Sequence, residues 1–125
     1  MRDVTPVVLF TYARPDHLAR VLTCLRENKV PLIWVFSDGA KGTEDRARVE
    51  AVRQMLTRVN WTEIRITKRL ENLGLGRNVR SGVEEVISEF SQFIVWEDDL
   101  IAVPGTYAWL VEALNHYRDD PKVMS

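Results

Sequence analysis

The sequence predicts a three-layer α/β/α fold with a mostly parallel sheet. Short apolar runs typical of buried strands alternate along the chain with longer segments whose apolar residues recur at helical spacing. The resulting order is β-α-β-α-β-α-β-α. Alternation of this kind is typical of a parallel sheet with helices on both faces, and right-handed crossovers then place the carboxyl ends of all strands at one edge.

The first half of the chain contains two of these strand–helix pairs. VVLFT, residues 7–11, reads as a buried strand, and Pro15 begins the following helix because proline suits a first helical turn. PLIWVFSDG, residues 31–39, is the second strand and ends in a turn. A charged helix is expected over residues 43–59. Its apolar face consists of Val49, Val52, Leu56 and Val59.

The second half repeats the pattern. TEIRITKR, residues 62–69, alternates like a half-exposed strand, and the loop ENLGLGRN follows it. FIVW, residues 93–96, is the fourth strand, and Pro104 with Gly105 breaks the chain after it. The helix before this strand is marked by Val79, Val83, Val86, Ile87 and Phe90. The last helix is marked by Trp109, Leu110, Ala113, Leu114 and Tyr117.

Composition excludes several classes of protein. The 17 basic and 18 acidic residues give a net charge of −1, which argues against nucleic acid as a partner. No apolar run approaches the ~20 residues of a transmembrane segment. Cys24 is the single cysteine, so no internal disulfide is possible, and its helical spacing predicts a place beside the core. These features fit a cytoplasmic location.

Polar residues follow every predicted strand, and a parallel sheet would gather them at one edge, where open α/β sheets bind ligands. In chain order the four sets are Thr11, Tyr12 and Arg14; Ser37, Asp38 and Gly39; Arg69, Glu71, Asn72, Gly74 and Gly76; and Glu97, Asp98 and Asp99. Surface charge scattered at random would have no reason to collect at strand ends.

The acidic set, Glu97 to Asp99, has two interpretations. Three adjacent carboxylates repel one another unless a cation neutralises them, and hard oxygen ligands suit Mg²⁺ or Mn²⁺. Alternatively, the acids cap the strand exit and pair with Arg or Lys. Their position directly after a four-residue apolar strand favours the metal.

Each of the other polar sets also has two interpretations when it is taken alone. Asp38 could form an Asx-type turn in which Gly39 takes a positive φ, or its carboxylate could bind a base N–H or a ribose hydroxyl. Arg14 could lie at a helix entrance or contact phosphate, which guanidinium matches well. Gly74 and Gly76 could form a plain turn or allow close approach to a ligand.

Taken together, these segments resemble the nucleotide-sugar glycosyltransferases of the GT-A fold, a Rossmann-like architecture. PVVLFTYARPDHLARVL is similar to the opening strand and helix of family 2-like members, and VFSDGAKG to their Asp-Gly turn. ENLGLGRNVRSGV resembles their asparagine- and glycine-containing loop. FIVWEDDLIAVPG is similar to the acidic motif in the branch containing N-acetylglucosaminyltransferase I. The resemblance covers essentially the whole chain.

The resemblance implies a strand order of 3-2-1-4 and a role for each polar set. Asp99 would bind the divalent metal, Mn²⁺ or Mg²⁺. Nucleotide-sugar contacts would come from Thr11, Tyr12, Arg14, Asp38, Asn72, Gly74, Arg77, Glu97 and Asp98. The activity implied is sugar transfer from a nucleotide-diphosphate donor, expected to be a UDP-sugar, to a saccharide or other hydroxyl acceptor.

The match also has a gap, because the acceptor-binding half and the usual catalytic base of this family follow the region matched here. We therefore expect residues 1–125 to be a single nucleotide-sugar-binding domain, truncated before the acceptor-binding half, with the base beyond the chain end. Two alternatives stay open. A nucleotidyltransferase would use similar metal chemistry but needs a Gly-rich basic loop where TYARPDH stands. A non-catalytic α/β binding domain, such as a receiver-like module, would need acids after the first strand.

Overall fold

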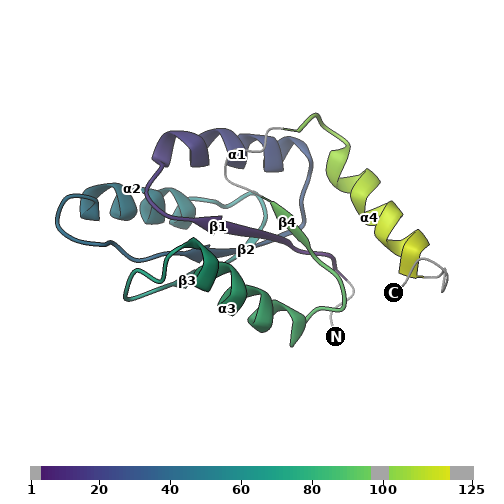
Figure 1. Ribbon diagram of the computed structural model, residues 1–125. Coiled ribbons are helices and arrows are strands. Elements are labelled where there is room, and N and C mark those ends of the chain that lie inside the picture. Colours follow the sequence, from purple (N-terminus) through teal and green to yellow (C-terminus); the bar gives the residue numbers. More distant parts are fainter. Residues whose placement is uncertain (1–3, 97–101, 119–125) are drawn as a thin grey trace.

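The computed structural model describes residues 4–96 and 102–118 and contains one sheet of four parallel strands. The strands are β1 (Val7–Thr11), β2 (Leu32–Ser37), β3 (Glu63–Lys68) and β4 (Ile94–Trp96). The helices between and after them are α1 (Pro15–Glu27), α2 (Arg46–Thr57), α3 (Leu75–Ile87) and α4 (Thr106–Arg118). The predicted alternation and the three-layer α/β/α class are both confirmed (Figure 1).

The strand order is β3-β2-β1-β4, as the resemblance implied. It matches the first four strands of the Rossmann order 3-2-1-4-5-6 and differs from the 2-1-3-4-5 order of flavodoxin-like and receiver domains. The register sets Thr11 beside Ser37 and Ser37 beside Lys68. The ends of the three strands are therefore level, and the residues that follow them emerge at one edge of the sheet.

Each face of the sheet has its own core because successive side chains of a strand point to opposite faces. One core is formed by residues such as Val7 and Leu9 of β1 with apolar side chains of α1, α2 and the start of α4. The other is formed by Val8 and Phe10 with Trp34 and residues of α3 and its C-terminal end. Figure 1 shows α1 and α2 on one side of the sheet and α3 on the other.

The helix α1 follows from its sequence. Pro15 occupies the first turn with Asp16, and Leu18, Val21 and Leu25 are buried at helical spacing. The helix ends in a Schellman motif, in which the amide of Val30 donates to the carbonyl oxygen of Leu25 at 3.3 Å. Such a stop directs the chain back toward the sheet to begin β2.

The position of Cys24 beside the core is confirmed. Its side chain is 3% exposed, and its Sγ lies 3.1 Å from the backbone nitrogen of Ala102. The thiol also donates to the carbonyl oxygen of Ala102. Asn28 in turn accepts a bond from the amide of Tyr107, so α1 contacts the chain on both sides of residues 103–105.

Three local expectations differ from the structure. The second helix begins at Arg46 rather than residue 43, because Asp45 accepts bonds from the preceding backbone amides instead of entering a helical turn. The fourth strand begins at Ile94 rather than Phe93. Gly39 is not among the described glycines with positive φ, which are Gly74 and Gly105.

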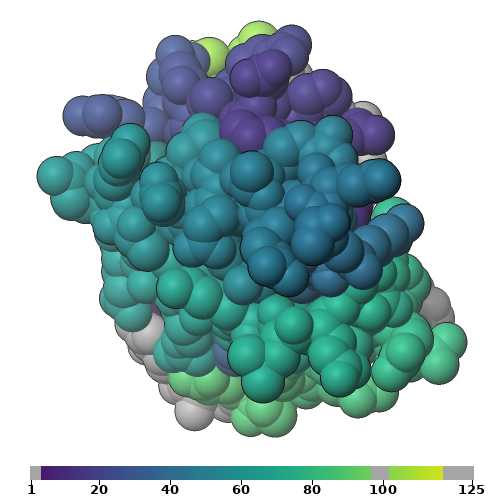
Figure 2. Space-filling model, turned by 90° about the vertical axis from the view of Figure 1, so that its left-hand side faces the viewer, coloured from purple at the N-terminus to yellow at the C-terminus, as the bar shows by residue number. Residues whose placement is uncertain are grey.

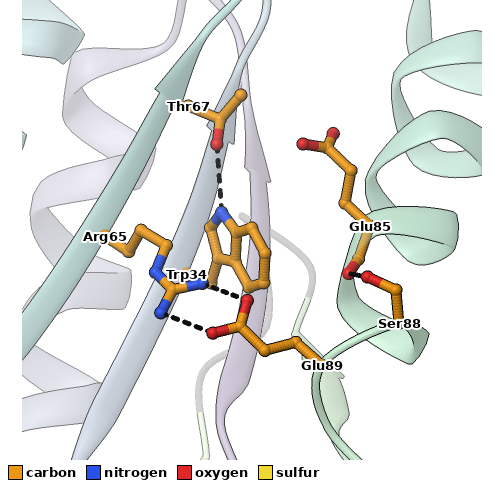
Figure 3. Close-up of polar contacts among 6 residues, drawn as sticks. All are labelled: Trp34, Arg65, Thr67, Glu85, Ser88 and Glu89. Carbon is orange, nitrogen blue, oxygen red and sulfur yellow. Dashed lines mark hydrogen bonds and ion pairs between the residues drawn. The ribbon is translucent and has the colours of Figure 1, made fainter.

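A polar cluster lies between β2, β3 and the end of α3 on the second face of the sheet; we call it the Trp34 cluster (Figure 3). The indole nitrogen of Trp34 donates to the hydroxyl of Thr67 at 3.0 Å. The guanidinium of Arg65 lies 4.4 Å from the Trp34 ring centroid and forms a two-point ion pair with Glu89 at 2.6 and 3.0 Å. The cluster therefore ties the edge strand β3 to α3.

Among the described residues, no helix has the length and apolar character needed to cross a membrane.

Candidate functional site

A cavity of about 350 Å³ opens at the carboxyl edge of the sheet. It lies where β1 and β2 end and α3 begins, the place at which open α/β sheets bind ligands. Its lining consists of Phe10, Thr11, Tyr12, Arg14, Asp38, Lys41, Asn72, Gly74, Leu75 and Asn78. Figure 2 shows the side of the molecule where these strands end. The region of α1 is purple, the region from β2 to α2 is blue and the region of α3 is green.

One wall of the cavity is organised by the carboxylate of Asp38, which is 3% exposed. Its Oδ1 accepts bonds from the amides of Gly39 and Leu73, each at 2.8 Å. Its Oδ2 accepts bonds from the amide of Gly74 at 3.1 Å and from the side chain of Asn72 at 3.4 Å. Four donors stabilise a buried carboxylate that would otherwise be costly to desolvate. Asp38 thus holds residues 72–74 against the end of β2.

Gly39 is required by this arrangement for a steric reason. A Cβ at this position would lie 2.7 Å from both the carbonyl carbon and the oxygen of Glu71, and 3.1 Å from the oxygen of Arg69. All three are backbone atoms, which cannot turn aside as a side chain can. The glycine therefore serves close approach of two loops rather than the positive φ expected from the turn.

Another part of the lining is Tyr12, which is held by Asp45 from outside the cavity. The Tyr12 hydroxyl donates to Asp45, whose carboxylate also accepts bonds from the amides of Lys41 at 3.0 Å and Gly42 at 3.1 Å. The bond from Tyr12 is the main reason that the pKa of Asp45 is lowered to about 2, and the bond to Asp45 raises the pKa of Tyr12. This arrangement fixes the loop that carries Lys41, whose ammonium lies 5.9 Å from the Tyr12 ring centroid.

The base of the cavity includes Asn78, which is 2% exposed. Its side chain donates to the carbonyl oxygen of Phe36 at 3.2 Å and accepts a bond from Nε of Arg69 at 3.1 Å. Arg69 also pairs with Glu85 at 3.2 Å. The first turn of α3 is therefore fixed to the ends of both β2 and β3.

Three groups at the cavity retain unused donor capacity. The hydroxyl of Thr11 is buried, with the residue 4% exposed, and has no hydrogen-bond partner within residues 4–96 and 102–118. Arg14 and Lys41 line the cavity as exposed cations, and neither forms an ion pair with a described residue. A ligand with several acceptor oxygens would match the two exposed cations, and it would meet the Thr11 hydroxyl only if the covering atoms moved aside.

The expected site residues fall into three groups. Thr11, Tyr12, Arg14, Asp38, Asn72 and Gly74 line the one cavity. Arg77 does not line it; this residue is exposed on α3. Glu97, Asp98 and Asp99 lie outside the described residues.

Sequence reasoning missed four lining residues: Phe10, Lys41, Leu75 and Asn78. A signal was available for Asn78. Successive residues of a helix are rotated by about 100°, so a helix that turns Asn78 toward the cavity turns Arg77 away from it. Lys41 had no comparable signal, since its position depends on the contact between Tyr12 and Asp45, which are distant in sequence.

The described residues were also considered as ligands of a metal ion. Within the described part of the chain, no group of three or more His, Cys, Asp or Glu side chains is close enough to hold one. The acidic set predicted to do so is not covered by that statement, because it lies in residues 97–101.

No protein-family model matches the chain, and no curated protein matches it significantly. What the described part of the molecule offers is an α/β sheet with a donor-rich cavity at its carboxyl edge.

Proposed function

We propose that the cavity binds the nucleotide part of a nucleotide-diphosphate sugar, and that the chain is the donor-binding part of a metal-dependent glycosyltransferase. The single observation that carries the proposal is the convergence of unused donors on the cavity. Thr11, Arg14 and Lys41 line this cavity together with the aromatic ring of Tyr12, and the Thr11 hydroxyl has no partner in the described structure. Nucleotides combine a flat base with a chain of acceptor oxygens.

In this proposal the phosphates lie toward Arg14, because its guanidinium can donate two parallel bonds to phosphate oxygens. The base lies beside Tyr12 and the wall formed by residues 72–74. Asp38 supports that wall through its four accepted bonds, and any contact with the ligand is additional to them.

The metal part of the proposal rests on the sequence alone. Asp99 would be the principal ligand, with Glu97 and Asp98 beside it, and oxygen ligands of this kind suit Mn²⁺ or Mg²⁺. A divalent ion bound there would stabilise negative charge on the leaving diphosphate. The acceptor, saccharide or other hydroxyl compound, and the catalytic base are not assigned to residues of this chain.

The test is calorimetric titration of the purified chain with uridine, UMP, UDP and UTP, each with MnCl₂ and then with EDTA. The proposal predicts that UDP binds more tightly than UMP, that uridine is weakest, and that Mn²⁺ strengthens UDP binding. A clear preference for UTP would favour the nucleotidyltransferase alternative. Absence of binding by UDP, GDP, CDP and dTDP alike would overturn the proposal.

A matched pair of variants tests the role of Arg14. Replacing Arg14 with Met removes the cation that lines the cavity, whereas Arg20→Met removes an exposed cation of α1 that does not line it. We expect Arg14→Met to weaken UDP binding about 10-fold and to leave uridine binding unchanged, because hydrogen bonds to charged groups contribute about 1.5–3 kcal/mol. Arg20→Met should bind both compounds like the unaltered protein.

A further inference from the structure

Arg53, on α2, contacts the ends of two neighbouring strands with one guanidinium group. Its Nε donates to the hydroxyl of Ser37 at 3.0 Å. Its Nη2 lies within donor distance of three backbone carbonyl oxygens: those of Ser37 at 3.3 Å, Asp38 at 3.2 Å and Arg69 at 2.8 Å. Ser37 ends β2, and Arg69 directly follows β3.

These contacts lie directly behind the cavity wall. Arg53 binds the main chain of Asp38, and the side chain of Asp38 binds the amides of Leu73 and Gly74. Arg53 also binds the carbonyl oxygen of Arg69, at the start of the loop that leads to those amides. One side chain therefore fixes the carboxyl ends of β2 and β3, from which the two loops of the wall emerge.

The type of residue matters as much as its position. A guanidinium presents several nitrogen donors in a fixed fork, so Nε can bind the Ser37 hydroxyl while Nη2 binds backbone carbonyl oxygens at both strand ends. Lysine has a single nitrogen and cannot bind the hydroxyl and these carbonyl oxygens with two separate donor atoms. Arg53 forms no ion pair with any carboxylate in the described ranges, and its contacts are to backbone and hydroxyl oxygens. Pairing with a carboxylate therefore does not explain the position of the Arg53 guanidinium.

We infer that Arg53 is a positioning residue for the nucleotide cavity. It acts through Asp38 on residues 72–74 and does not line the cavity itself. The inference deepens the proposed function and rests on it for the identity of the ligand, but the effect on residues 73 and 74 can be measured without any ligand.

The first measurement is amide hydrogen exchange by NMR in Arg53→Met, Arg53→Lys and the control Arg46→Met. Arg46 is an exposed arginine at the start of the same helix, and no hydrogen bond of its side chain occurs in the described structure. We expect the amides of Leu73 and Gly74 to exchange at least ~10-fold faster in both Arg53 variants, with amides of β1 unchanged, because local opening reports local contacts. Arg46→Met should exchange like the unaltered protein.

Two exchange results would overturn the inference. The first is unaltered exchange at Leu73 and Gly74 in both Arg53 variants. The second is an equal increase at these amides and at Leu9 of β1, which would show a general loss of stability rather than positioning. Should Arg53→Met fail to fold, Arg53→Lys decides the question by the same criteria.

The second measurement is UDP titration in the presence of MnCl₂. We expect both Arg53 variants to bind UDP about 10-fold more weakly, the lower end of the effect of losing a residue that orients a ligand-binding group. Faster exchange with unchanged UDP affinity would refute a positioning role in binding. If the unaltered protein does not bind UDP, the proposed function fails, and the exchange result still decides whether Arg53 positions the wall.

Discussion

The Trp34 cluster and the cavity are both polar regions set against the same sheet, and they differ in how their donors are used. In the Trp34 cluster the indole N–H binds Thr67 and the guanidinium of Arg65 binds Glu89. At the cavity the Thr11 hydroxyl is buried without a partner in the described structure, and the cations Arg14 and Lys41 face open space.

Under the proposed function, this difference separates a stabilising polar cluster from a binding site. An unsatisfied buried hydroxyl costs free energy, about 1–3 kcal/mol when it is fully desolvated. A protein tolerates such a group where a ligand supplies the missing partner. The Trp34 cluster has no comparable deficit and is best explained as a tie between β3 and α3.

The largest effect that tests this comparison is expected from Gly39→Ala. The added methyl group would overlap backbone atoms of Glu71, so we expect a loss of about 1–3 kcal/mol in the free energy of unfolding. We also expect UDP affinity to fall about 100-fold, because the wall at residues 72–74 must shift by a distance on the order of 1 Å. Chemical denaturation and calorimetry measure the two effects.

Gly42→Ala is the matched control, because a Cβ there would meet no atom within 4 Å. It should leave both stability and UDP affinity unchanged. Equal behaviour of the two alanine variants would show that the close approach at Gly39 does not hold in solution.

Thr11→Val should separate stability from binding. Valine keeps the shape and removes the unpartnered hydroxyl, so we expect the protein to become about 1 kcal/mol more stable. The same change should weaken UDP binding about 5-fold, through loss of one ligand hydrogen bond. Thermal denaturation and calorimetry are the measurements.

Thr5→Val provides the contrast, because the buried Thr5 hydroxyl already accepts a bond from Gln92 at 2.7 Å. It should lower stability and leave UDP affinity unaltered. A loss of stability in Thr11→Val, like that in Thr5→Val, would contradict the assignment of Thr11 to the ligand.

Glu89→Gln tests the other side of the comparison. The side chains of Arg65 and Glu89 are 35% and 40% exposed, so solvent screens much of their attraction. We expect a loss of only about 0.5 kcal/mol in stability and no change in UDP affinity. A marked fall in UDP affinity would mean that the Trp34 cluster and the cavity are coupled.

Tyr12→Phe should have the smallest effect at neutral pH and a defined effect in acid. Asp45 stabilises the fold as a carboxylate, so its contribution is present above its ordinary pKa of 3.8 and is lost as the pH falls toward 2. Without the Tyr12 hydroxyl we expect the pKa of Asp45 to rise toward 3.8, and the loss to begin at higher pH. NMR titration of the carboxyl carbon measures this.

At alkaline pH, the contribution of Tyr12 to stability changes with pH in the opposite direction. The pKa of Tyr12 is raised above 10.0, so its contribution is complete below pH 10 and is lost as the pH rises through the folded-state pKa. Tyr12→Phe should abolish this alkaline loss. An unaltered pKa of Asp45 in the variant would show that the hydrogen bond does not form.

The fold was predictable because its signals are local. Strand and helix patterns need only neighbouring residues. The strand order was expected from the resemblance, and the structure confirms that order. The cavity residues that the sequence predicted lie at strand ends, as Thr11 and Asp38 do, or in the loop after β3, as Asn72 does. Lys41 and Arg53 depend on contacts between segments far apart in sequence.

The predicted start of the second helix was wrong for a related physical reason. The second helix was expected from residue 43, yet Asp45 binds Tyr12 and the amides of Lys41 and Gly42 before the helix begins. A side chain with a tertiary partner can thus delay a helix that local pattern would start earlier. Arg77, which the resemblance places among the nucleotide-sugar contacts, lies exposed on α3 and does not line the cavity.

The sheet topology has a consequence for the order of folding. Every described residue that lines the cavity lies between Phe10 and Asn78, whereas β4 joins β1 through distant partners such as Val7 and Ile94. Closing the shorter loops that join β1, β2 and β3 costs less chain entropy than closing the loop to β4. The described lining of the cavity can therefore come together on β1, β2 and β3 before β4 joins the sheet.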